Sequence, residues 1–272
     1  MSQRDSESRT LKTVSRLIKI IEVLARSGSI GVTTLARRLD LSKSTVHAYL
    51  KTLEENGFVV KGGEKYQLAH ELMLLGESIR SQHILYQAGR GEIEELATET
   101  GQYAHLTIEE NGKGINLYQA RGETVAGYEY QSAKLHQPDH LHLTAAGKAI
   151  LAFLPRDQVE VILNRHGLQR HTVNTITERE ALFEELKTIR ECGHAFNDEE
   201  EIDGFRAVGA PIRRPDGELL GALSVSGPTS VLAGDRFYEE LPKAVTRTAN
   251  EIEVSINMSN KYSTSSHRPG DR

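Results

Sequence analysis

The order of elements in the first seventy residues constrains this chain most strongly. Three short segments carry apolar side chains at the i, i+3 and i+4 spacing of helices with one buried face. Thr13 or Ser15 can cap the start of the first segment, and Gly28 can end it. Its apolar positions are Val14, Leu17, Ile18, Ile21 and Leu24.

A second and a third helix follow, joined by a short turn at residues 40–42. Thr33 is a candidate N-cap for the second helix, and Gly57 can adopt the left-handed conformation that ends the third. Two β-like runs, 58–61 and 64–68, then flank a turn at Gly62 and Gly63, which predicts a hairpin.

Helix, helix, short turn, helix and hairpin is the order of a winged helix-turn-helix. The outward positions of the third helix are small, polar or basic, so this helix can approach base edges in a major groove. Basic side chains on the second helix and the hairpin, and the N-terminus of the third helix, can meet phosphates. The alternative is a small helical module with an ordinary solvated surface or a protein-binding role. The predicted DNA-binding residues are Thr33, Arg37, Arg38, Ser42, Lys43, Ser44, Thr45, His47, Lys51, Lys61 and Lys65.

The net charge argues against a nucleic-acid partner, but its distribution argues for one. The chain has 33 Lys and Arg residues against 38 Asp and Glu residues, a formal net charge of −5. Residues 1–70 carry +5, whereas residues 71–272 carry −10. A basic head on an acidic body suggests two tasks, one of them with a polyanion.

Composition narrows the cellular setting. No stretch approaches the roughly 20 consecutive apolar residues that span a bilayer. The first ten residues lack the apolar core of a secretory signal, and the lone Cys192 excludes an internal disulfide and a cysteine-based zinc site. We therefore expect a cytoplasmic protein with no membrane partner.

Beyond the hairpin, helical spacing continues at Leu72, Leu75 and Ile79, and it resumes at Leu85 and Ile93. This predicts a linker helix over 71–82 and then the first helix of a second domain; one kinked helix is the alternative. β-like runs follow at 103–109 and 115–120, and Tyr128 and Tyr130 indicate another strand. Further predicted elements are helices at 145–153, 157–166 and 178–192, strands at 205–213 and 218–226, and a last helix at 235–257.

This mixture predicts an α+β domain on an antiparallel sheet. The expected organisation is a winged helix-turn-helix at 10–70, a linker helix at 71–82 and a ligand-binding and oligomerisation domain at 83–257. The ends, 1–9 and 258–272, are polar and aperiodic, so we expect them to be disordered.

A ligand site is predicted where hydroxyls interrupt an apolar strand. Ser224 and Ser226 lie two apart within 219–226, so strand alternation puts both hydroxyls on one face. Buried hydroxyls need hydrogen-bond partners, and a bound carboxylate would serve; the neighbouring backbone is the alternative. Thr144 would cap the next helix and leave the N–H groups of Ala145 and Ala146 for an anion.

Three stretches of the chain resemble IclR-type transcriptional regulators. They are VTTLARRLDLSKSTVHAYLKTLEENGFV at 32–59, HLTAAGKAILAFLP at 142–155 and DGFRAVGAPIRRPDGELLGALSVSGP at 203–228. The resemblance covers roughly residues 10–257, and GALSVSGP together with TAAGKA is its most specific part. It implies a GAF-like fold for the second domain and a ligand-responsive regulator that binds double-stranded operator DNA as a homodimer, often paired into a homotetramer.

The resemblance also implies an effector site. Ala145 and Ala146 match the family's backbone contacts to the effector, and Ser224 and Ser226 match its paired serines. Asn197 and Ala207 occupy further pocket positions, where the best-studied members have Asp and Cys, so the resemblance does not identify the effector. A carboxylic acid or a sugar-derived compound is the expected ligand.

Two other classes of function remain alternatives: an architectural DNA-binding protein without a ligand, and an enzyme. Ala145-Ala146-Gly147-Lys148 lacks the leading glycine and the following Ser/Thr of a phosphate loop, and Cys192 needs a positioned base to act as a nucleophile. A metal at His136, Asp139, His140 and His142 is a further alternative. The acidic run at 198–201 is interpreted as a solvated face, or as a carboxylate that gates the pocket. We expect no catalysis, no metal and no cofactor.

Overall fold

The computed structural model describes residues 10–123, 125 and 138–265, the last seven of these by their backbone alone. The chain divides into two compact units, Met1–Arg80 and Ser81–Arg272. Each unit has its own apolar core, and each is described by itself below.

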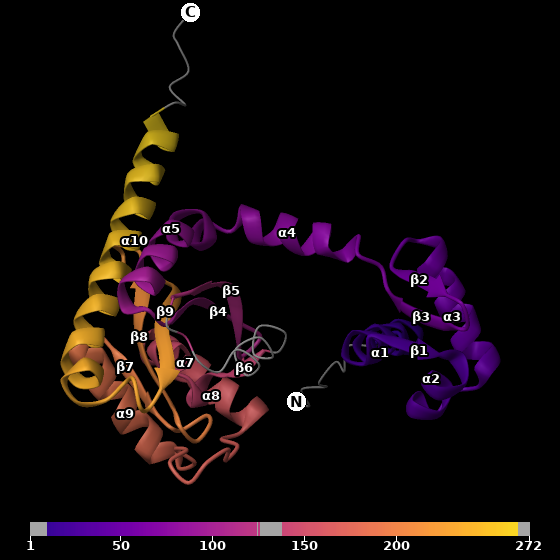
Figure 1. Ribbon diagram of the computed structural model, residues 1–272, viewed down its shortest axis with the longest axis horizontal. Helices are drawn as coiled ribbons and strands as arrows, with labels where there is room; N and C mark the ends of the chain where they lie inside the picture. The colour runs from indigo at the N-terminus through magenta and orange to yellow at the C-terminus, as the bar shows by residue number, and fades with distance from the viewer. Residues whose placement is uncertain (1–9, 124, 126–137, 266–272) are drawn as a thin grey trace, which may run out of the picture. The chain divides into compact units, whose positions relative to one another are not determined.

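The N-terminal unit has the predicted order of a winged helix-turn-helix (Figure 1). Its core includes Ile20, Leu35, Val46, Leu50 and Tyr66. A short strand that the sequence analysis missed, β1, pairs with β3 and makes the hairpin a three-stranded antiparallel sheet of order β1-β3-β2. The elements are α1 (Lys12–Ser27), β1 (Ser29–Gly31), α2 (Val32–Leu39), α3 (Lys43–Glu55), β2 (Val59–Gly62) and β3 (Lys65–Leu68).

The helix starts differ from the prediction. α1 begins after Leu11 without a side-chain cap, so neither Thr13 nor Ser15 caps it. α2 begins after Gly31 because β1 ends there, and this puts Thr33 inside the first turn of the helix. The hairpin turn also shifts by one residue, since Gly62 already pairs with Lys65.

The C-terminal unit contains a six-stranded antiparallel sheet of order β6-β5-β4-β9-β8-β7. The two edge strands, β6 and β7, were not predicted, and the strand expected at Tyr128 and Tyr130 lies outside the described residues. The strands are β4 (Tyr103–Glu110), β5 (Lys113–Arg121), β6 (Asp139–His140), β7 (Ala195–Asp198), β8 (Phe205–Arg213) and β9 (Leu219–Pro228).

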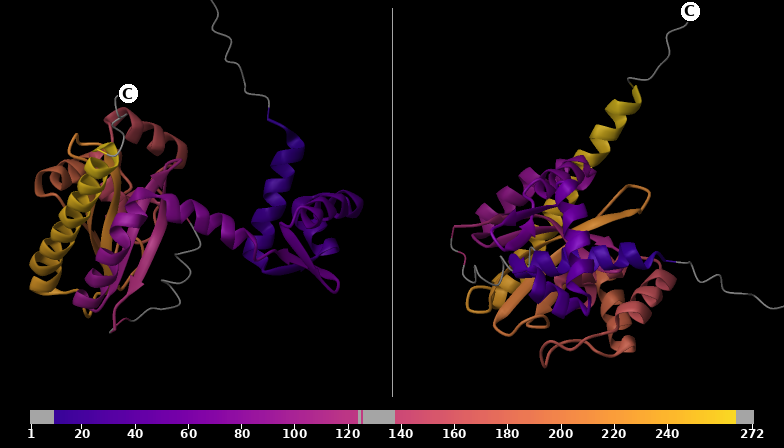
Figure 2. Two further views of the ribbon diagram at one scale, coloured as in Figure 1. Left: turned by 90° about the horizontal axis from the view of Figure 1, so that it is seen from above. Right: turned by 90° about the vertical axis from the view of Figure 1, so that its right-hand side faces the viewer.

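Helices cover both faces of this sheet, as the views in Figures 1 and 2 show. α5 (Ile84–Thr100) and α10 (Leu241–Ser265) pack on one face. A 3-10 turn, η1 (Leu141–Leu143), leads into α7 (Ala145–Phe153) on the other face, where α8 (Arg156–His166) and α9 (Arg179–Cys192) share its core. β9 contributes side chains to both faces of the sheet, as its alternation predicts. Its Leu223 and Val225 belong to the core that the sheet forms with α5 and α10.

Two predictions about helix limits had different outcomes. α4 (Leu72–Gln82) ends before His83, whose side chain caps α5, so the linker is a separate helix and not part of one kinked helix. The last helix, however, follows a short π-helical segment, η2 (Arg236–Glu240), and continues to Ser265, so disorder was wrongly expected at 258–265. Residues 243–265 contain no glycine or proline that would end it earlier. The rest of the expected tails, 1–9 and 266–272, lies outside the described residues.

Within the described ranges, no helix is long and apolar enough to cross a membrane.

Gly57 ends α3 in the predicted left-handed conformation, with φ +75°. The Phe58 N–H donates to the Leu53 carbonyl at 2.8 Å, and the Gly57 N–H donates to the Glu54 carbonyl at 3.1 Å. These two bonds satisfy carbonyls at the helix end, in the pattern of a Schellman motif. They turn the chain from α3 directly into β2.

Gly57→Ala should therefore lower the free energy of unfolding of the N-terminal unit by about 1–2 kcal/mol, because a Cβ is disfavoured in the left-handed region. Gly62→Ala is the matched control, since nothing lies within 4 Å of a Cβ there. Hydrogen exchange of peptides from residues 43–68 in increasing denaturant measures the effect. Equal protection in the two variants would contradict the assigned cap.

Candidate functional site

A narrow cavity in the C-terminal unit lies between the sheet and the first turn of α7. Its volume is about 20 Å³, which is room for about one water molecule. A larger ligand must therefore widen it. The lining residues are His105, Thr144, Ala145, Asn197, Glu201, Ile202, Phe205, Arg206, Ala207, Ser224 and Ser226.

The first turn of α7 forms one wall. The Thr144 hydroxyl accepts the Gly147 N–H at 2.9 Å, which confirms the predicted N-cap. A Cβ on Gly209 would lie 2.8 Å from backbone atoms of Ala145 and Ala146, so only glycine lets β8 approach this turn so closely. Of the two alanines, only Ala145 is among the residues that line the cavity. The remaining N–H groups of a first turn have no partner within the helix and attract anions.

The two serines lie on the cavity face, as their spacing predicts. Within the described part of the chain, the Ser224 hydroxyl has no hydrogen-bond partner, although Ser224 is buried. The Ser226 Oγ lies 2.9 Å from Nε2 of His105, whose Nδ1 is 3.1 Å from the Asn116 amide nitrogen. Sequence reasoning missed His105; the only signal was a polar residue between Tyr103 and Thr107 on one face of β4.

Asn197 and Ala207 also line the cavity and face each other across β7 and β8. The Asn197 side chain donates to the Leu143 carbonyl at 2.9 Å and accepts the Glu200 N–H at 2.9 Å. Both ends of its amide are thus used to hold the chain before α7 and the loop after β7. Asn197 therefore positions the cavity wall.

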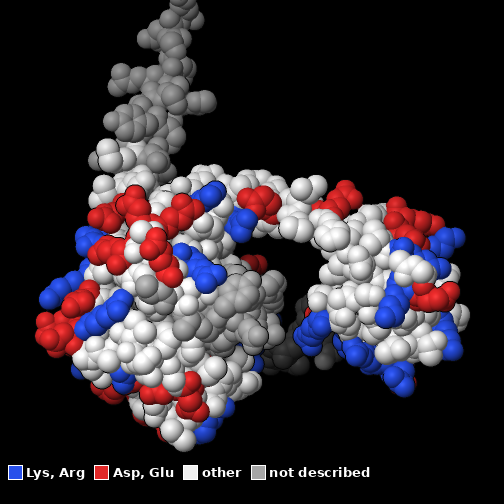
Figure 3. Space-filling view, viewed as in Figure 1, with Lys and Arg blue, Asp and Glu red and all other residues white. Residues whose placement is uncertain are grey.

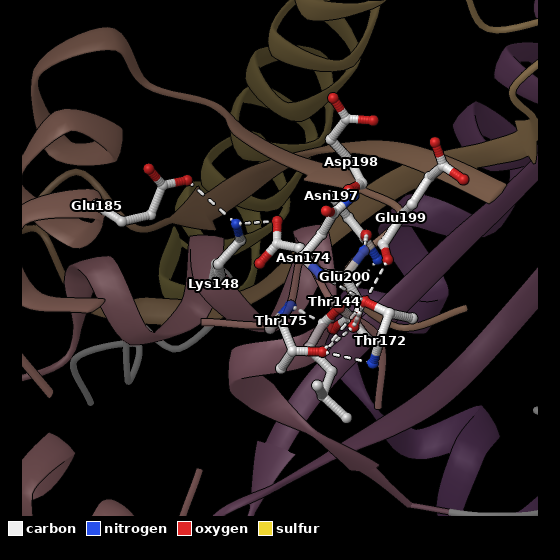
Figure 4. A network of polar contacts seen from close by, with 12 residues as sticks. Thr144, Lys148, Thr172, Asn174, Thr175, Glu185, Asn197, Asp198, Glu199 and Glu200 are labelled. Atoms are coloured by element: carbon white, nitrogen blue, oxygen red, sulfur yellow. Dashed lines mark hydrogen bonds and ion pairs between the residues drawn. The ribbon is translucent and has the colours of Figure 1, made fainter. Parts of the chain in front are cut away.

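Within the acidic run 198–201, which was interpreted as a solvated face, Glu200 is buried, whereas the other three residues are partly exposed. Glu200 is 6% exposed, and its Oε1 lies 2.6 Å from Nζ of Lys148, which also contacts Glu185 at 3.1 Å (Figure 4). Burial raises the pKa of the Glu200 carboxyl, although the Lys148 ammonium opposes this shift. The missed signal was Lys148 itself, a cation inside the otherwise apolar run of α7.

Further polar contacts hold the loop that contains Glu201 and Ile202. Thr172 and Thr175 donate hydroxyl hydrogen bonds of 2.7 Å to the carbonyls of Glu199 and Glu200, respectively (Figure 4). Arg206 forms an ion pair with Asp198 at 2.6 Å, which raises the pKa of its guanidinium. The cavity wall is therefore fixed by charges and hydroxyls from several elements.

The candidate DNA-binding surface lies on the N-terminal unit. Ser42 caps α3 by accepting the Thr45 N–H at 3.1 Å, and its hydroxyl also contacts those of Ser44 and Thr45. Lys43, Ser44, His47 and Lys51 are exposed on one helix whose opposite face is buried in the core. Polar and basic side chains thus point outward together, as predicted.

The other predicted DNA-binding residues surround α3. Thr33, Arg37 and Arg38 are exposed on α2, and Lys61 and Lys65 are exposed on the hairpin. The Arg38 guanidinium donates to the Ser27 hydroxyl at 2.6 Å, so Arg38 also ties α2 to the end of α1. In the face shown in Figure 3, blue and red side chains both lie over this unit, and blue ones gather along its lower part.

The sequence matches two family models along most of its length. Residues 13–63 match the IclR helix-turn-helix domain, and residues 77–254 match the model described as bacterial transcriptional regulator IclR C-terminal. The chain belongs to the IclR family of transcriptional regulators. A probable HTH-type transcriptional regulator, ArcR, of Halobacterium salinarum is 38% identical over 253 residues, which cover 93% of this chain and 96% of that one. The transcriptional repressor IclR of Escherichia coli is 29% identical over 255 residues and 90% of each chain.

Solved structures of IclR proteins share the fold. The IclR of Thermotoga maritima superposes with a TM-score of 0.72 at 26% identity, covering 91% of this chain and 99% of that one. An IclR homologue from Microbacterium hydrocarbonoxydans, complexed with 4-hydroxybenzoate, gives 0.77 at 20% identity over 91% and 100% of the chains. The matched families and named relatives are transcriptional regulators and not enzymes, which agrees with the prediction from sequence.

The structure gives little support to the other candidate sites of this IclR protein. Among the described residues no cluster of His, Cys, Asp and Glu can hold a metal, and His136 lies outside them. Burial and the neighbouring Lys113 lower the pKa of His140 to about 4. The Cys192 thiol faces the carbonyls of Ile189 and His194 and not a base.

A larger hollow of about 730 Å³ lies on the outer side of α10. It is open, and none of its polar lining residues, such as Lys243, Arg247 and Glu251, is buried. The narrow cavity at α7, with its buried polar groups, therefore remains the candidate effector site of this regulator.

Lys148→Met should lower the free energy of unfolding of the C-terminal unit by about 3 kcal/mol or more, because it leaves the buried Glu200 charge without its closest partner. A carboxyl whose pKa is higher in the folded than in the unfolded state destabilises the fold once it ionises. The loss of unfolding free energy in Lys148→Met should therefore be largest at neutral pH and shrink as the pH falls toward about 5. Chemical unfolding at several pH values measures this.

The matched control is Lys148→Met combined with Glu200→Gln, which removes the unpaired charge and should restore part of the lost stability. A deficit that is independent of pH and equal in both variants would contradict the assigned ion pair.

Proposed function

We propose that this protein is a ligand-responsive regulator that binds operator DNA as a symmetric oligomer and senses a small carboxylate. The observation that carries the proposal is the Ser224 hydroxyl, which lines the cavity beside the first turn of α7 on a buried residue and has no hydrogen-bond partner among the described residues. The other unit of the chain exposes a polar and basic helix. A protein with this role acts where the chromosome is, so we place it in the cytoplasm.

The DNA-binding part of the proposal rests on α3. Its exposed side chains are short or basic, so the helix can enter a major groove and hydrogen-bond base edges. The N–H groups of Lys43 and Ser44 remain for a phosphate after Ser42 has taken that of Thr45. Arg37, Lys61 and Lys65 extend the basic surface on both sides for further phosphate contacts.

Two features support a symmetric oligomer: the small size of the α3 surface, and the exposed apolar side chains of α1 and α4. One such helix reads few base pairs, so useful specificity requires paired half-sites. α1 exposes Val14 and Ile18, and α4, which has no buried residue, exposes Met73, Leu74 and Ile79 at 69–73% of their surface. Large apolar side chains that gather on the exposed surface of a helix are typical of protein–protein contacts. We assign this apolar surface to a second copy of the chain.

The ligand class follows from the groups that converge on the cavity. The Ala145 N–H and the Ser224 hydroxyl can both donate, and a helix N-terminus favours negative charge. The family relative bound to 4-hydroxybenzoate, a carboxylate, supports the same class here. Ligand binding would favour one arrangement of the linker helices and so change the spacing of the DNA-binding units, which is a shift between pre-existing states.

An architectural DNA-binding protein would lack any ligand response, whereas an enzyme would consume its ligand. A thermal-shift screen with small organic acids and sugars, combined with footprinting on DNA from neighbouring promoters, separates the three functions.

Lys43→Ala and Lys51→Ala should each weaken operator binding and reduce the slope of log affinity against log salt by about 1, because each removes one phosphate contact. Lys187→Ala, at an exposed position of α9, is the matched control and should change neither quantity. Fluorescence anisotropy over a range of salt concentrations measures both. An unchanged slope in both α3 variants would show that α3 is not the recognition helix.

Ser224→Ala combined with Ser226→Ala should abolish the ligand-induced rise in melting temperature and the ligand effect on operator binding. Operator binding without ligand should stay at the wild-type level, because the serines lie in the other unit. Ser230→Ala, exposed just after β9, is the control. A full ligand response in the double variant would refute the assigned cavity.

A further inference from the structure

On β4 and β5, three buried polar atoms have no hydrogen-bond partner among the residues that the structure describes. They are the Tyr103 hydroxyl, Oδ1 of Asn116 and Oε1 of Gln119. Buried polar atoms in native proteins are nearly always paired, and an exception calls for a specific explanation such as a ligand. Exchanging the nitrogen and oxygen positions of the Asn116 amide does not supply the missing hydrogen bond, because one of its two polar atoms then still lacks a partner.

The three residues are neighbours of His105 in the sheet, and His105 itself lines the cavity. The Tyr103 and His105 rings are 6.4 Å apart between centroids, and the Asn116 amide nitrogen is 3.1 Å from Nδ1 of His105. His105 pairs with Ser224 on one side and with Gln119 on the other, across the adjacent strands β9, β4 and β5. Residues paired in this way share one face of a sheet. The polar groups thus form a strip that begins at Ser224 and ends at Gln119.

The two ends of this strip have opposite hydrogen-bonding character. At the β9 end, the Ser224 hydroxyl and the Ala145 N–H donate, which suits a carboxylate. At the β5 end, the unpaired amide oxygens accept, which suits hydroxyl groups. Strands lie about 4.8 Å apart, so β9 and β5 are separated by about 10 Å. With a hydrogen bond of about 2.8 Å at each end, a chain of about six carbon atoms can reach both.

We propose that the effector site continues from the serine pair across β4 to β5, and that Tyr103, Asn116 and Gln119 bind the hydroxyl groups of a polyhydroxylated carboxylate. The inference rests on the proposed function, in which the cavity binds a carboxylate. Binding requires the strip to open together with the narrow cavity. Tyr103, Asn116 and Gln119 are then the residues that distinguish a hydroxylated chain from an apolar one.

Calorimetric titration of the full-length protein with D-gluconate and with hexanoate tests this, since the two probes share a six-carbon carboxylate and differ in their hydroxyl groups. The wild type should bind gluconate more tightly. Asn116→Leu and Gln119→Leu should each weaken gluconate binding about tenfold while leaving hexanoate binding unchanged. Gln158→Leu, exposed on α8, is the matched control and should bind both probes as the wild type does.

Ser224→Ala separates this inference from the proposed function, because it should weaken binding of both carboxylates. If Ser224→Ala weakens both probes but the two leucine variants keep wild-type affinity for gluconate, the extended site is refuted and the carboxylate site stands. If Ser224→Ala changes neither affinity, the proposed function fails. Gluconate binding that is absent, or no tighter than that of hexanoate, overturns the inference. Melting temperatures at the wild-type level show that the variants are folded.

Discussion

The first turn of α7 lies in backbone contact with Gly209 of β8, and the cavity depends on that contact. Because Gly209 pairs with Ser224, the helix N-terminus is held beside the serine strand. Any side chain at this position would push the helix away and separate the N–H groups from the hydroxyls. Thr144 complements the contact by capping the helix through Gly147, which leaves the earlier N–H groups of the turn for a ligand.

The same helix carries the buried ammonium of Lys148, which fixes the loop on the other side of the cavity through Glu200. A buried ion pair adds little stability compared with well-packed apolar residues, but removing one partner is costly. Its effect here is geometric, since it joins α7 to the loop that contains Glu201 and Ile202. The helix, the loop and the sheet are therefore linked. A ligand that widens the cavity must disturb the ion pair as well as the apolar packing.

Local sequence patterns predicted the features that depend on residues close to one another in the sequence. Helical spacing gave α1 and α3, Gly57 gave the end of α3, and alternation placed Ser224 and Ser226 on one face of β9. What the sequence could not predict depends on partners far along the chain. β1 and β7 are too short to show a period, and their partners β3 and β8 stabilise them. His105 and the Lys148–Glu200 pair were missed for the same reason, because neither residue type nor spacing indicates which distant side chain will be close.

The N–H of Ala145 tests the effector site most directly, because it should bind the carboxylate itself. In protein labelled with ¹⁵N-alanine, titration with acetate should move the Ala145 amide proton downfield as it forms a charge-assisted hydrogen bond. Acetamide, which has the same shape but no charge, should have little effect, and Ser224→Ala should reduce the acetate shift. An Ala145 signal that stays in place at saturating acetate, or that moves equally with acetamide, would contradict a carboxylate site at α7.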